Sequence, residues 1–117
     1  MGSRGNIKIT QPWSAESIYL YSHYDGETIC EALGNGVYMV IQHRRTNDPA
    51  YATRIIFDEL TQCARRGTGY GISIGEPSDN QYPIPEVSWT SDYEMVITYE
   101  SATYTPQQFI DWVNSSS

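Results

Sequence analysis

The amino-acid sequence predicts an α+β domain: a five-stranded, mostly antiparallel sheet, in the order ββααβββα, with a helical hairpin packed on one face. Two short segments of alternating polar and apolar residues open the chain, and similar segments recur after residue 69, as expected for half-buried strands. Between them, apolar residues recur at helical spacing in two consecutive segments. A chain of 117 residues has the size of one domain, so we expect a single domain over residues 1–114 and a disordered tail at 115–117.

The first two strands are expected at residues 6–10 and 17–23, where strongly β-forming residues alternate with polar ones. The short linker between them favours an antiparallel hairpin. Because successive side chains of a strand point to opposite faces, Ile18 and Leu20 share one face of the second strand. The other face carries an aromatic stripe formed by Tyr19, Tyr21 and His23.

The two helices are expected from about Glu27 and from Pro49 to about Ala64. Asp25 is the expected N-cap of the first helix, and the Asp-Pro pair is a favourable start for the second. A short connection between them indicates a helical hairpin.

The second half of the sequence predicts three more strands and a short helix. Residues 70–75 alternate glycines with apolar side chains, and a hairpin is expected from residues 86–89 and 93–100. A three-residue turn, which pairs Trp89 with Tyr93 and Val87 with Met95, keeps the apolar residues on one face. The helix begins at Thr105-Pro106. We expect this helix, a second subunit or a ligand to cover the sheet face that carries the aromatic stripe.

Charge is distributed unevenly along the chain. The formal net charge is -7, yet all seven Lys and Arg lie in residues 1–66 together with seven acids, so residues 67–117 carry the whole excess. An acidic protein is poorly suited to direct binding of DNA or RNA but compatible with a basic partner. No segment is apolar enough to span a membrane and the N-terminus does not resemble a secretory signal, so we expect a cytoplasmic protein.

Residues 22–30 hold the tightest cluster of residue types that serve in catalysis: Ser22, His23, Asp25 and Cys30. Ser22 and His23 are adjacent on a strand and point to opposite faces, so they do not form a nucleophile-base pair. A half-buried, hydrogen-bonded histidine is the favoured interpretation of His23, and a small hydrolase that uses His23 is a weaker alternative.

The cysteines and histidines do not indicate a metal site. The soft metal ligands are His23, His43, Cys30 and Cys63, with no spacing typical of zinc, so we expect neither a metal nor a cofactor. In a helical hairpin Cys30 and Cys63 are able to approach each other, but the sequence does not establish a bond. Reduced thiols are the expected state in the cytosol.

The aromatic stripe is the best candidate for ligand binding. Arg4 precedes the first strand and so lies near the end of the second, where His23 is expected. Aromatic rings stack on planar groups, and Arg4 would bind a phosphate. Arg54 is explained by an ion pair with Asp58 four residues later, and the glycine-rich segment Gly67–Gly71 runs from helix to strand, opposite to most phosphate loops.

Four short segments resemble a loose set of small uncharacterised proteins encoded by phages, prophages and bacteria. Those proteins open with a G-[ST]-R-x-N-I element, here Gly2–Ile7, followed by a tyrosine-rich strand that ends in His-x-x-Gly, here Tyr19–Gly26. Tyr51–Phe57 and Thr68–Ser73 are also similar to that set. The resemblance implies an anti-defence role, either sequestration of a nucleotide-derived immune signal or inhibition of a host defence protein. The matched positions are Arg4, His23, Tyr24, Arg54 and Tyr70.

Three functions follow as hypotheses. The leading one is a non-catalytic protein, expected to be a homo-oligomer in the host cytosol, that sequesters a small nucleotide-like ligand. Its predicted ligand-binding residues are Arg4, Tyr19, Tyr21, His23, Tyr24, Arg54 and Tyr70. The second is an acidic inhibitor or DNA mimic that binds a basic host protein, and the third is the His23 hydrolase.

Overall fold

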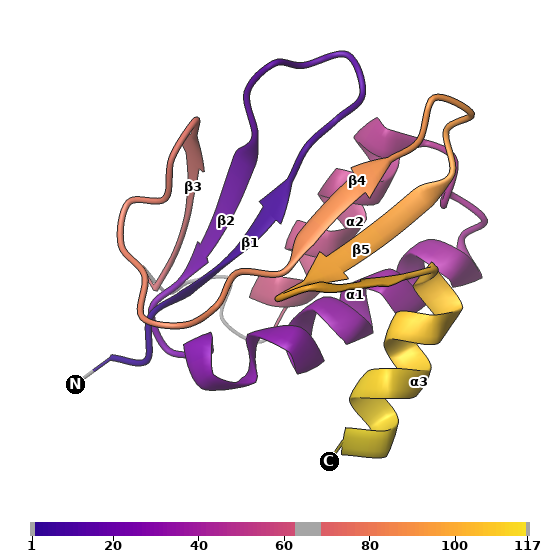
Figure 1. Cartoon of the computed structure of the whole chain (residues 1–117). Helices are drawn as coiled ribbons and strands as arrows, with labels where there is room; N and C mark the ends of the chain where they lie inside the picture. Colours follow the sequence, from indigo (N-terminus) through magenta and orange to yellow (C-terminus); the bar gives the residue numbers. More distant parts are fainter. Residues whose placement is uncertain (1, 63–68, 117) are drawn as a thin grey trace.

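The computed structural model describes residues 2–62 and 69–116 and confirms the α+β class. In this part of the chain a mixed six-stranded sheet, in the order β3-β2-β1-β4-β5-β6, carries the helices on one face (Figure 1). None of the helices described is long and apolar enough to cross a membrane.

Three strands form one half of the sheet as antiparallel neighbours. β1 (Gly5–Ile9) pairs with β2 (Ile18–Ser22), which pairs in turn with the edge strand β3 (Tyr70–Ile74). Ile7 lies opposite Leu20, and both are buried on the helix side of the sheet. The predicted first hairpin and the third strand are therefore confirmed.

The other half consists of β4 (Glu86–Trp89), β5 (Met95–Tyr99) and β6 (Ala102–Tyr104). It corrects the predicted sheet on two points, since the described residues form six strands and β4 pairs with β1 in parallel. β6 has only three residues, too few to show alternation in the sequence. The parallel pair arises because the connection 75–85 returns along the sheet to the starting end of β1 before β4 begins (Figure 1).

The register of the β4–β5 hairpin also differs from the prediction. Trp89 pairs with Met95 and Val87 with Ile97, so five residues form the loop instead of three. Thr90 closes this loop, because its hydroxyl accepts hydrogen bonds from the backbone N–H groups of the loop. A shift of two residues leaves every side chain on the same face, so the apolar pattern does not distinguish the two registers.

The two predicted helices form a hairpin behind the sheet. α1 (Ile29–Gln42) follows the short 3-10 turn η1 (Gly26–Thr28), and α2 (Pro49–Thr61) begins at the predicted Asp-Pro pair. A Cβ atom at Gly36 would lie 3.1 Å from the Cα of Ile56, so the helices approach closely at this glycine. Asp25 does not cap through its side chain. The predicted end of the second helix at Ala64 lies outside the described residues, as does Cys63.

α3 (Pro106–Ser116) packs on the same side of the sheet as α1 (Figure 1). Phe109 is completely buried in the common core, and the position of Gly34 on α1 faces Val113 of α3. α3 therefore does not cover the aromatic stripe, which was one of the three expected coverings. The helix includes Ser115 and Ser116, residues that the sequence assigned to a tail.

Candidate functional site

The aromatic stripe lies on the sheet face opposite the helices, but its side chains are largely engaged within the protein. Tyr19 is only 8% exposed, and the ammonium of Lys8 lies 5.9 Å from its ring centroid. The Tyr21 hydroxyl and the Nδ1 atom of His23 are hydrogen-bonded at 2.8 Å. The stripe is therefore a packed surface with only part of its aromatic area accessible.

Arg4 lies on the same face, beside the connection 75–85. Its guanidinium is 3.0 Å from the carboxylate of Asp79, and its backbone N–H donates to the side chain of Gln81. The buried Asn6 fastens the same connection, because its amide donates to the Asp79 carbonyl and to the Asn80 side chain. The cation that was expected to take a phosphate thus forms an ion pair with a partly exposed carboxylate.

Of the three remaining predicted ligand residues, Tyr24 adjoins the aromatic stripe, whereas Tyr70 and Arg54 lie elsewhere. Tyr24 follows the stripe at its edge, is 66% exposed and meets the His23 ring edge to face at 4.8 Å. The Tyr70 hydroxyl donates to the carboxylate of Asp25 on the helix side of the sheet. Arg54 lies on α2 in an ion pair with Asp58, as its spacing predicts.

Ser22 and His23 do not form a catalytic pair. Ser22 is buried and its hydroxyl accepts a hydrogen bond from the backbone N–H of Asp25, while the His23 ring contacts Tyr21 and Tyr24. Within residues 2–62 and 69–116, no group of His, Cys, Asp and Glu side chains is arranged to hold a metal ion.

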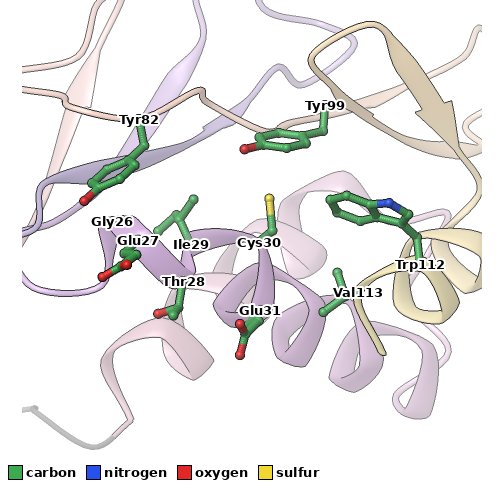
Figure 2. A pocket seen from close by; sticks show the side chains of 10 residues that line it. All are labelled: Gly26, Glu27, Thr28, Ile29, Cys30, Glu31, Tyr82, Tyr99, Trp112 and Val113. Carbon is green, nitrogen blue, oxygen red and sulfur yellow. The ribbon is translucent and has the colours of Figure 1, made fainter. Parts of the chain in front are cut away.

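A cavity of about 180 Å³ lies where η1 and α1 meet the last strands and α3. Figure 2 shows three aromatic side chains around it, each from a different segment: Tyr82 from the connection 75–85, Tyr99 from the end of β5 and Trp112 from α3. Ile29 and Cys30 of α1 form the opposite wall (Figure 2). We refer to this space as the aromatic cavity.

Cys30 and Tyr99, two of the residues that line the aromatic cavity, are neutral near pH 7. Burial raises the pKa of the Cys30 thiol to about 11; a hydrogen bond with Tyr99 opposes this shift, and the carboxylates of Glu100 and Glu31 add to it. Burial also raises the pKa of Tyr99 to about 12, with further contributions from Cys30 and Glu100. Cys30 is therefore a thiol, which is a poor nucleophile.

Three carboxylates lie close to the aromatic cavity. Glu27 and Glu31 line it, and Glu100 is close enough to raise the pKa of Cys30. All three are exposed, and none is in an ion pair with another described residue. An anion that enters this space would be repelled, whereas a cation would be attracted.

None of the predicted ligand residues lines this cavity. The helix that the sequence predicts from Thr105-Pro106 contains Trp112, and the helix predicted from about Glu27 has Cys30 near its start, but the sequence predicted no contact between the two residues. The available signal was the density of aromatic residues from Tyr99 to Trp112, where four of fourteen residues are aromatic. Comparisons with protein-family models, with curated proteins and with solved structures found no match.

Proposed function

We propose that this chain is a non-catalytic binding protein that docks on a basic surface of a partner protein through the carboxylates around the aromatic cavity. The observation that carries the proposal is the contrast between paired and unpaired charges. Four of the five bases in residues 2–62 and 69–116 lie 3.0–3.9 Å from a carboxylate. These pairs are Arg4 with Asp79, Lys8 with Glu86, Arg45 with Asp48 and Arg54 with Asp58.

These ion pairs change the interpretation of the uneven charge distribution along the sequence. Arg4 and Lys8 are neutralised by acids from the second half of the chain, so the first half does not offer a free cationic surface for phosphate at these residues. The excess negative charge remains on exposed side chains such as Glu27, Glu31 and Glu100. Complementary charge accelerates association and selects partners, and it does so most strongly at low salt. The resemblance to phage-encoded proteins suggests a host defence protein as the partner.

The test is capture of host proteins on the immobilised chain, followed by affinity measurement with each purified candidate. We expect binding of a basic protein that weakens steeply with salt. A triple variant, Glu27→Gln, Glu31→Gln and Glu100→Gln, should reduce affinity by more than about tenfold, since each rim charge contributes a fraction of the total.

A matched control removes the same charge elsewhere. The control acids are exposed and lie at the opposite end of the strands: Glu16, Glu76 and Asp92. Glu16 precedes β2 and Asp92 precedes β5. The aromatic cavity lies at the other end, because η1 follows β2 and Glu100 follows β5. Their replacement by Gln, Gln and Asn should leave the affinity within about twofold. Equal losses in both triple variants would mean that only net charge matters and would contradict the proposed surface.

Sequestration of a small nucleotide-like ligand is a second candidate, favoured by the exposed ring of Tyr24 beside His23. Thermal unfolding in the presence of cyclic dinucleotides and ADP-ribose derivatives tests it. A ligand that stacks on this ring should raise the midpoint of the wild-type protein and have a smaller effect on Tyr24→Ala. If no ligand of the panel shifts the midpoint, this second candidate is wrong.

A further inference from the structure

We propose that the aromatic cavity binds the guanidinium group of an arginine side chain presented by the partner. This inference rests on the proposed function, because the arginine belongs to the basic surface on which the chain docks. It adds a specific recognition site to a surface that is otherwise defined by charge.

Aromatic rings from three segments line the aromatic cavity. Tyr82, Tyr99 and Trp112 surround one space, as Figure 2 shows, and all three are half-buried. The faces of aromatic rings carry partial negative charge, so a cation above them is attracted, most strongly above tryptophan. The other lining side chains include the uncharged Ile29 and Cys30, and none of the lining residues carries a positive charge that would oppose a cation.

Trp112 is held in place before any ligand arrives. Its ring centroid lies 5.7 Å from that of Tyr99, 5.5 Å from that of Tyr104 and 5.8 Å from that of Phe109. Phe109 is completely buried, so this cluster is anchored in the core. A side chain that is already ordered loses little conformational entropy on binding, which favours affinity from few contacts.

The carboxylates near the aromatic cavity favour a guest of positive charge. Glu31 lines the aromatic cavity, and the fields of Glu31 and Glu100 both raise the pKa of Cys30, so negative potential reaches the interior. An aliphatic or neutral aromatic guest would bury the rings without using these charges. An anionic guest, including any phosphate, would be opposed by them.

The volume of the aromatic cavity suits one amino-acid side chain and not a larger ligand. Its volume of about 180 Å³ is below the range of roughly 300–1,000 Å³ found for pockets that enclose drug-sized ligands. A dinucleotide is therefore too large to be enclosed. Arginine fits better than lysine, because the planar guanidinium stacks on rings and is more weakly hydrated than an ammonium group.

The test is a titration of the full-length protein, followed by NMR, with N-acetyl-arginine amide and with N-acetyl-citrulline amide, which has the same shape but no charge. We expect the arginine probe to give saturable shifts at the Trp112 indole and at the backbone N–H groups of Thr28 and Cys30. The citrulline probe should give none at the same concentrations. Equal binding of both probes, or shifts elsewhere on the molecule, would overturn the inference.

Two variants distinguish the contribution of the aromatic rings to binding from that of the carboxylates. Tyr82→Leu removes one wall that lies outside the helical core, and Glu31→Gln removes one charge; each should weaken binding of the arginine probe by about threefold or more. Tyr51→Leu is the control, because Tyr51 is an exposed tyrosine on α2 that is not part of the aromatic cavity. If Tyr82→Leu is folded and binds the probe as the wild type does, the rings do not recognise the cation and the inference is wrong.

The two proposals fail in different ways. A basic partner whose binding depends on the three carboxylates, together with no binding of the arginine probe, would overturn the inference and leave the proposed function intact. Binding of the arginine probe, together with no partner that depends on these carboxylates, would overturn the proposed function.

Discussion

The guanidinium of Arg4 and the carboxylate of Asp79 lie 3.0 Å apart and join the start of the sheet to the connection 75–85. This pair links the first half of the sequence, which holds every Lys and Arg, to its acidic second half. The residue that best suited a phosphate in the sequence therefore has a carboxylate partner in the fold.

The anchoring of this connection predicts an order of stabilities. Asn6 is completely buried and donates to two oxygens of the connection, so Asn6→Ala should lower the free energy of unfolding by about 1–3 kcal/mol. Arg4→Gln should cost less than about 1 kcal/mol, because the side chains of its ion pair are 38% and 46% exposed and solvent screens them. Urea denaturation measures both. The reverse order would show that the connection is held by the charges.

The different exposure of two isoleucines in the sheet predicts a second difference in stability. Ile97 of β5 is completely buried, so Ile97→Ala should cost about 2–5 kcal/mol. Ile74 of the edge strand β3 is 60% exposed, so Ile74→Ala should cost less than about 1 kcal/mol. Thermal denaturation of the two variants measures both losses. Equal destabilisation would contradict the sheet order.

The environment of Cys30 predicts slow alkylation. With a pKa of about 11 against an ordinary value of 9.0, the thiolate fraction at pH 8 is about a hundredfold lower than that of an unperturbed cysteine. We expect the reaction of Cys30 with iodoacetamide, followed by mass spectrometry in a Cys63→Ser background, to be at least about tenfold slower than in the urea-unfolded chain. Equal rates would mean that the thiol is exposed.

The same thiol predicts a loss of stability in alkali. The unfolded chain releases the Cys30 proton near its ordinary pKa of 9.0, whereas the folded chain retains it up to about 11, so deprotonation between these values favours unfolding. Tyr99 acts in the same direction between 10.0 and about 12. The urea midpoint should fall over this range and fall less in Cys30→Ala. A pH profile that is identical in both proteins would contradict the raised pKa of the half-buried Cys30 thiol.

Periodicity was sufficient for most elements and insufficient for the aromatic cavity. The helical spacing of Ile29, Leu33 and Val37 and the alternation in β1 and β2 are local patterns, and each predicted the correct element and face. β6 was missed because three residues carry too little pattern, and the β4–β5 register was wrong because a shift of two residues preserves the faces.

The sequence by itself determined the α+β class, the faces of the strands, the start of α2 and the excess of negative charge, because these depend on residues close together in the chain. Only the tertiary structure decided which charges are neutralised and where the aromatic side chains converge. Arg4 and Asp79, like Cys30, Tyr99 and Trp112, are far apart in sequence and meet because the connection 75–85 crosses to a parallel strand and α3 folds back on α1. Such contacts depend on strand order and helix packing, which no local pattern encodes.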